Sequence, residues 1–357
     1  MIFIRQGYLM KFDVRQTNIS KGIAVLLLLW HHAFFNSHGA YGHYHSLLKF
    51  GDLPVEAVIS DMFKVCVAIF LILSGYGMYQ SYAKNLEKSK KKGIRFDLSF
   101  VRYRLLKLYI PFWVIYVIFV PMGLLFGRDY VALYGSNPLN AIADFFGLAY
   151  LIHGPLSFTA NAAWWYMSLI VVFCVLYPLL HRLLTYSPEL TLAIALLLNF
   201  AILPAREYNI WFLPFVLGMY ASRRNLFEKI YELLGTDTNR ILASFLLVIA
   251  FALCKNTFYD DLHFDFAFGF AIILFVYFAI SRIPGVSLFL EDIGKKSGLI
   301  FMFHSFIYSL YFANFIYSFR YPPLIYLVLL VICYAIAWIL KLLIDVTRVN
   351  KLNRLSV

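Results

Sequence analysis

Long apolar stretches recur from one end of the chain to the other, and they constrain its fold more than any other feature. A helix needs about 20 apolar residues to cross a bilayer. Only 14% of the residues are charged and 62% are hydrophobic, whereas about 25% of a soluble domain is charged. We therefore expect an all-α, polytopic membrane helix bundle of about ten transmembrane helices that forms one domain over residues 1–357. The expected spans are 19–36, 57–82, 101–126, 163–184, 189–204, 208–222, 241–256, 264–282, 297–318 and 323–345.

An eleventh apolar stretch, 139–153, decides the expected topology. It is short, contains Asp144 and ends in His153-Gly-Pro. Lys and Arg gather near the N-terminus, in 84–107, in 221–240 and near the C-terminus, and such loops are usually cytoplasmic. All four lie on one side only if 139–153 does not cross the membrane. We therefore expect a re-entrant or interfacial segment there, both termini in the cytoplasm and a plasma (inner) membrane location. The net charge of +12 then reflects cytoplasmic loops, and no nucleic-acid partner is expected.

The first expected span carries ionisable residues at both ends. Lys21 and His32 are eleven residues apart, which places them within about 20° on one helix face and roughly 16 Å apart along the axis. His31 lies about 80° away from Lys21. Charged groups in a span normally face a protein interior or a wet cavity. Histidine can act as a general base, and lysine can bind an anion. Alternatively, Lys21 extends to the interface and His32 only bonds a neighbouring helix.

Two further groups of residues are candidates for substrate binding. Arg102, Arg104 and Lys107 lie at the start of a span. They can bind a phosphorylated donor or simply anchor the helix on the cytoplasmic side. The aromatic run Trp164, Trp165 and Tyr166 can form one wall of a sugar site or part of an aromatic belt.

A late histidine and a loop cluster complete the candidates. His304 lies inside an apolar stretch, where it serves a substrate site or the packing of the helix. His38, His43 and His45 match no specific metal-site spacing, so no metal is expected. The Gly75 segment, Ser-Gly-Tyr-Gly, is typical of close helix contact.

Taken in order, these motifs resemble the membrane-bound acyltransferase-3 family. The family's basic residue and histidine, ten residues between them, correspond to Lys21 and His32. Its Phe-Phe-x-x-Ser-Gly-Phe resembles Ile69–Tyr76, and its Arg-x-Arg with a later basic residue and Pro resembles 102–111. The mid-chain Trp-Phe-x-x-x-Leu resembles 165–169, and the late Leu-Ile-x-x-x-His resembles 299–304. The likeness covers about residues 15–340.

The resemblance implies a membrane O-acyltransferase. The donor would be acyl-CoA, usually acetyl-CoA, a co-substrate taken from the cytoplasmic side, with no tightly bound cofactor. The acceptor would be a hydroxyl of an extracytoplasmic or lipid-linked sugar or polysaccharide. His32 would act as general base or transient acyl carrier, with Lys21 lining the donor path. Partners would then be acyl-CoA, the sugar and membrane lipids.

The site residues follow from the same resemblance. The basic residues at 102, 104 and 107 would hold the CoA phosphates, and Trp164, Trp165, Tyr166 and His304 would contact the acceptor. Two departures affect these expectations: Lys21 replaces the commoner Arg, and the Glu that many members carry after the mid-chain Trp is absent from 169–172. The competing interpretations are a saccharide or glycolipid transporter, in which Lys21 and His32 line the path, and an inactive scaffold of a polysaccharide-export complex.

Overall fold

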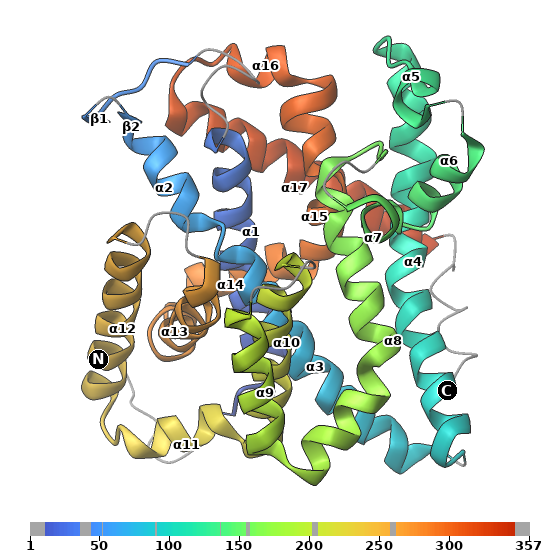
Figure 1. Ribbon diagram of the computed structural model, residues 1–357. Helices are drawn as coiled ribbons and strands as arrows, with labels where there is room; N and C mark the ends of the chain where they lie inside the picture. Colours follow the sequence, from blue (N-terminus) through green and yellow to red (C-terminus); the bar gives the residue numbers. More distant parts are fainter. Residues whose placement is uncertain are drawn as a thin grey trace. The chain divides into compact units, whose positions relative to one another are not determined.

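The computed structural model of this chain is built almost entirely of helices (Figure 1), which confirms the expected all-α class. It describes residues 11–35, 44–51, 53–89, 91–135, 137–154, 158–201, 206–257 and 262–346. Within these ranges the only strands are β1 (Lys49–Phe50) and β2 (Leu53–Pro54), which pair antiparallel.

Within the described residues, helices occupy every expected span. The long helices are α1 (Val14–Phe34), α3 (Cys66–Lys88), α4 (Gly93–Leu125), α8 (Trp165–Tyr186), α9 (Pro188–Phe200), α10 (Arg206–Arg224), α12 (Asp237–Thr257), α13 (Asp265–Phe278) and α17 (Pro322–Val346). Shorter ones are α2 (Val55–Phe63), α5 (Tyr130–Tyr134), α6 (Pro138–Phe145), α7 (Ala149–His153), α11 (Leu226–Leu233), α14 (Pro284–Lys295), α15 (Ser297–Ser305) and α16 (Ala313–Tyr317). A π-helical turn, η5 (Phe306–Tyr311), joins α15 to α16.

Six of the described helical segments are long and apolar enough to cross a membrane. The chain is therefore a multi-pass membrane protein, whereas the count of ten spans and the orientation of the termini stay predictions. The expected spans 57–82 and 297–318 are interrupted: 57–82 breaks between α2 and α3, and 297–318 contains the π-turn. The doubtful stretch 139–153 holds only α6 and α7, of eight and five residues, and neither can span a bilayer alone.

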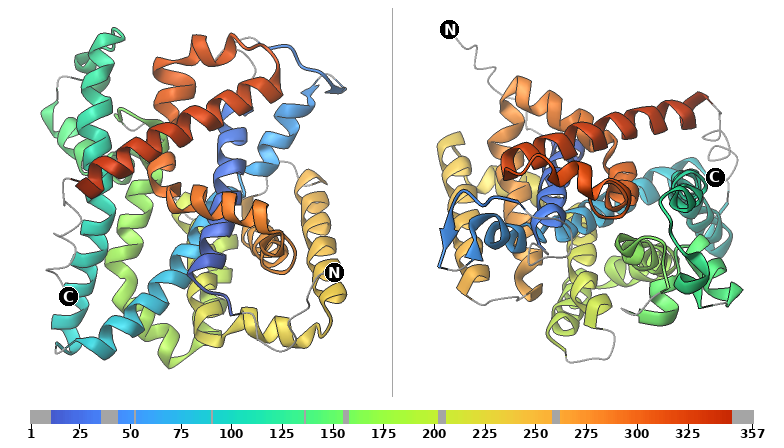
Figure 2. Two further views of the ribbon diagram at one scale, coloured as in Figure 1. Left: turned by 180° about the vertical axis from the view of Figure 1, so that it is seen from behind. Right: turned by 90° about the horizontal axis from the view of Figure 1, so that it is seen from above.

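The chain divides into two compact units. The first comprises Met1–Ala24, Val65–Gln80 and Leu183–Lys295; the second comprises Val25–Lys64, Ser81–Arg182 and Lys296–Val357. The views in Figure 2 follow the helices of each from behind and from above. The expectation of one domain over 1–357 stays a prediction.

Glycines let helices of the first unit approach closely. A Cβ at Gly75 of α3 would overlap the Phe215 carbonyl of α10, and one at Gly218 of α10 would overlap the Ile72 carbonyl of α3. Gly22 of α1 and Gly294 of α14 form a second reciprocal pair, against Leu290 and Asn18. Small residues at helix contacts are the usual means of close packing in membranes, so the expected close contact at Gly75 is confirmed.

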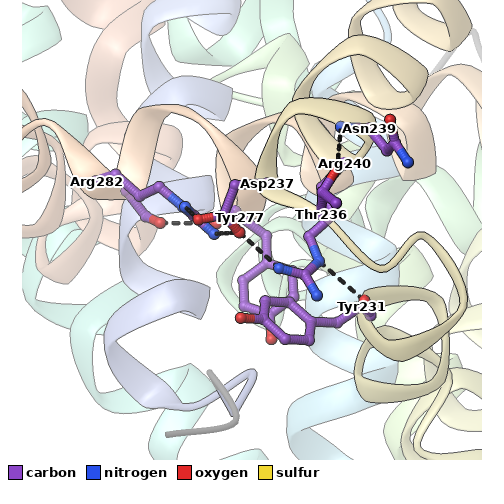
Figure 3. Close-up of polar contacts among 8 residues, drawn as sticks. Tyr231, Thr236, Asp237, Asn239, Arg240, Tyr277 and Arg282 are labelled. Atoms are coloured by element: carbon purple, nitrogen blue, oxygen red, sulfur yellow. Dashed lines mark hydrogen bonds and ion pairs between the residues drawn. The ribbon is translucent and has the colours of Figure 1, made fainter. Parts of the chain in front are cut away.

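Charged residues of the first unit are paired near both ends of α12. At its start, Asp237 lies between Arg282 and Arg240 (Figure 3), with 2.5 Å between its Oδ1 and Nη1 of Arg240. The guanidinium of Arg240 lies over the Tyr231 ring, 3.4 Å from its centroid. Near its other end, Nζ of buried Lys255 lies 2.6 Å from Oδ1 of Asp265. Paired charges avoid the cost of an isolated ion in an apolar surrounding.

One buried carboxylate organises the short helices of the second unit. Asp144 accepts hydrogen bonds from the hydroxyls of Tyr134 (2.8 Å) and Thr159 (2.6 Å) and from the backbone N–H of Ala160 (2.8 Å). These bonds join α5, α6 and the segment that leads to α8. A carboxylate that accepts several bonds can fix irregular backbone that has no helix or strand partners of its own.

Candidate active site

Three imidazole rings lie together in the second unit. His31 and His32 come from the last turn of α1, and His304 comes from α15. The ring centroids of His31 and His32 are 4.9 Å apart, and those of His32 and His304 are 4.7 Å apart. His31 and His304 are buried and His32 is half-buried. His32, the histidine that shares a helix face with Lys21, is thus the most accessible of the three.

Backbone carbonyls determine which nitrogen carries the hydrogen in two of these rings. Nδ1 of His31 lies 2.7 Å from the Ser60 carbonyl, and Nδ1 of His304 lies 3.1 Å and 2.9 Å from the carbonyls of Ile300 and Phe301. Because a carbonyl only accepts, Nδ1 is the protonated nitrogen in each neutral ring. Nε2 of His304 is then a bare acceptor, and it is buried with no hydrogen-bond partner within the described ranges.

The π-turn after His304 brings a tyrosine to the same place. The Tyr308 hydroxyl lies 3.3 Å from Nδ1 of His32, and its ring stacks on His304 at 5.8 Å between centroids. π-Turns inside α-helices occur frequently at functional sites. Tyr308 was missed in the sequence, although it follows His304 by four residues and such residues are helix neighbours.

The mid-chain aromatic residues differ in accessibility. Trp164 is buried, and its indole N–H donates to the Met302 carbonyl at 2.8 Å, beside the amide of Asn161. Trp165 and Tyr166 are half-buried. Tyr166 packs on Phe301 (4.6 Å), which lies one turn before His304. Trp164 therefore positions α15, while Trp165 and Tyr166 keep accessible surface.

The basic residues of α4 do not share one face. Arg102 is exposed, and a separation of two residues turns it about 200° away from Arg104. Arg104 is half-buried beside Cys174 of α8, its Nε has no hydrogen-bond partner among the described residues, and it lies near Lys107. Arg104 and Lys107 are three residues apart and form a pair on one side of the helix.

Two further sequence predictions concern Lys21 and the loop histidines. Lys21 is half-buried on α1, within the first unit, and the helix runs unbroken from Val14 to Phe34 as the alignment with His32 requires. His38 and His43 lie outside the described residues. Within the described ranges no three His, Cys, Asp or Glu side chains are grouped as metal ligands.

Comparison with known families assigns the chain. A family model described as "Acyltransferase domain" (Acyl_transf_3) matches residues 16–342. The chain belongs to the acyltransferase-3 family. No curated protein and no solved structure matches it. The match runs through the residues of both units, and it makes this chain a membrane acyltransferase.

Proposed function

We propose that this acyltransferase transfers an acetyl group from acetyl-CoA to a hydroxyl of an extracytoplasmic or lipid-linked sugar, at the plasma (inner) membrane. The supporting observation is the half-buried His32 ring, held between His304 and Tyr308. A histidine that is reachable yet surrounded by oriented polar groups suits general-base catalysis.

In the proposed reaction, His32 removes the proton of the acceptor hydroxyl as its oxygen attacks the thioester carbonyl. The tetrahedral adduct collapses, the carbon–sulfur bond breaks, and the proton passes from His32 to the leaving CoA thiolate. The ester and free CoA are the products. In the alternative course, His32 first carries the acyl group itself, and a second transfer delivers it to the sugar.

Other residues have binding roles in this proposal. The adjacent cations Arg104 and Lys107 contact the anionic part of CoA, since two like charges side by side favour an anion between them. Arg102, on another face, adds to the basic surface. Lys21 lines the donor path. Trp165 and Tyr166 offer aromatic and hydroxyl contacts to the acceptor, and His304 supplies an acceptor nitrogen next to His32.

The test is transfer of labelled acetyl groups from acetyl-CoA in membranes that contain matched histidine variants. His32→Ala should give no transfer above membranes that lack the protein. His31→Asn keeps a donor for the Ser60 carbonyl and should retain most activity. His45→Ala, an exposed histidine next to Tyr321, is the control and should match the wild type.

Equal labelling by wild type and His32→Ala would exclude the His32 mechanism. If the wild type labels no glycan, while a labelled saccharide crosses vesicles that contain it, the transporter interpretation replaces this proposal.

A further inference from the structure

A break in the second expected span places a lysine beside the histidines. Helix α2 ends at Phe63 and α3 begins at Cys66, with Lys64 at the break. The N–H of Lys64 bonds to the Asp61 carbonyl at 3.4 Å instead of continuing the α-helical pattern to Ser60. The Ser60 carbonyl accepts the Nδ1 hydrogen of His31. The break thus leaves the Ser60 carbonyl available as a hydrogen-bond acceptor for His31.

The Lys64 side chain reaches toward the same histidines. Its Nζ lies 6.0 Å from the centroid of the Phe35 ring, and that ring lies 4.8 Å from the His31 ring. The side chain is half-buried and makes no ion pair within the described ranges, although Asp61 precedes it by one turn.

An ammonium in an apolar span is costly and normally marks a pathway or a ligand site. A structural explanation also exists, because Lys64 lies near the C-terminal end of α1, where the helix dipole attracts a cation. That explanation predicts a loss of stability on removing the charge, but no effect on the choice of acceptor.

We propose that Lys64 binds an anionic group, a carboxylate or a phosphate, on the sugar acceptor. This inference rests on the proposed acyl transfer. The ammonium lies beside the Phe35 ring, which contacts the His31 ring and belongs to the residue three positions after His32. The reacting hydroxyl at His32 and the charged substituent at Lys64 would therefore be separate groups of one sugar. Lysine suits this role because it acts as a point charge toward an anion.

The experiment compares three acceptors that share the hydroxyls at C2, C3 and C4 and differ at C6: 4-nitrophenyl glucoside, the corresponding glucuronide and the glucoside 6-phosphate. Labelled acetyl-CoA is the donor, and kcat/KM is measured for wild type, Lys64→Gln, Lys64→Arg and the control Lys49→Gln, an exposed lysine of β1. The wild type should prefer one or both anionic acceptors by about tenfold, the value of one well-placed ion pair.

Lys64→Gln should remove this preference and leave the glucoside rate within about twofold, while Lys64→Arg and Lys49→Gln should keep the preference. The stronger of the two anionic acceptors identifies the anion. A wild type without preference, an unchanged preference in Lys64→Gln, or an equal loss on all three acceptors would overturn the inference.

A binding measurement separates this inference from the proposed function. Equilibrium dialysis of the labelled glucuronide and of the labelled 6-phosphate against the purified protein needs no acyl donor. Binding that depends on Lys64 without any acetyl transfer would support the anion site and contradict acyl transfer to these sugars. Transfer that does not depend on Lys64 would support the function and overturn the anion site. Binding of both anions that is equal in wild type and Lys64→Gln would also overturn the anion site.

Discussion

At the scale of single residues, the Tyr308 hydroxyl distinguishes His32 from the other two histidines. His31 and His304 direct Nδ1 to backbone carbonyls, which cannot donate. His32 directs Nδ1 to a hydroxyl, which can donate or accept. A base at Nε2 of His32 requires the hydrogen on Nδ1, so Tyr308 would accept it and hold the ring in that orientation.

Removing this hydroxyl should therefore slow the chemical step. For Tyr308→Phe we expect kcat to fall about tenfold or more with KM nearly unchanged, since only the orientation of the base is lost. Steady-state acetyl transfer checks this. Tyr326→Phe is the matched control, because its hydroxyl bonds the Leu26 carbonyl of α1 at 3.1 Å, away from the histidines. A rise in KM alone would assign Tyr308 to substrate binding instead.

Part of this site follows from the sequence. A rotation of 100° per residue aligns His32, and not His31, with Lys21. The same rotation turns Arg102 and Arg104 to different faces of their helix. The meeting of His304 with His32 does not follow, because it depends on how two helices pack 272 residues apart in the chain. Lys64 could have been noticed as a charge inside an apolar stretch, but its closeness to the histidines depends on the break that frees the Ser60 carbonyl.

At the scale of elements, the close packing of α3 on α10 requires glycine, because any Cβ at the contact would overlap backbone of the other helix. Gly75 and Gly77 are two residues apart on α3 and therefore face different sides. Only Gly75 lies against backbone, and a Cβ at Gly77 would meet nothing within 4 Å.

Gly75→Ala should therefore destabilise the protein and Gly77→Ala should not. We expect Gly75→Ala to lower the free energy of unfolding by about 1–3 kcal/mol, the usual cost of overpacking. Thermal unfolding in detergent, followed by the loss of monodisperse protein, measures both variants. Equal midpoints for the two variants would show that α3 and α10 do not touch at Gly75.

The Asp144 carboxyl gives a second prediction at this scale. Burial raises its pKa above the ordinary value, despite three hydrogen bonds that oppose the shift. A group whose pKa is raised on folding stabilises the folded state at low pH and loses that contribution as the pH rises through the folded-state pKa. Asp144→Asn removes the titration and keeps an oxygen for Tyr134 and Ala160.

The melting temperature of the wild type relative to Asp144→Asn should therefore fall as the pH rises from about 4 to 8. Asp144→Ala should be less stable than both at every pH, since it leaves buried donors unpaired at about 1–3 kcal/mol each. A difference between wild type and Asp144→Asn that does not change with pH would show that the carboxyl does not titrate in this range.

At the scale of the whole molecule, the order of spans is set by α6 and α7. Both are too short to cross alone, so the loop charges can all lie on the cytoplasmic side. This arrangement stays a prediction from the sequence, which rests on bilayer thickness and on the positive loops. The sequence could not predict α11 and α14, whose short amphipathic helices resemble loops between apolar stretches.

This topology predicts opposite labelling of two engineered cysteines in a Cys254→Ser background, where the other native cysteines are buried. Thr236→Cys, in the turn between α11 and α12, should react with an impermeant maleimide only after the cells are opened. Leu139→Cys, exposed on α6, should react in intact cells. Labelling of Thr236→Cys from outside would mean that 139–153 crosses the membrane.

The π-turn η5 also has an evolutionary consequence. A π-turn accommodates one residue more than an α-turn, so η5, which contains Tyr308, holds the equivalent of a single-residue insertion. Losing one residue from this turn would rotate the following side chains by about 100° and carry the tyrosine hydroxyl away from His32. Relatives with and without the insertion would then differ in how they orient the same histidine, although their motifs read alike.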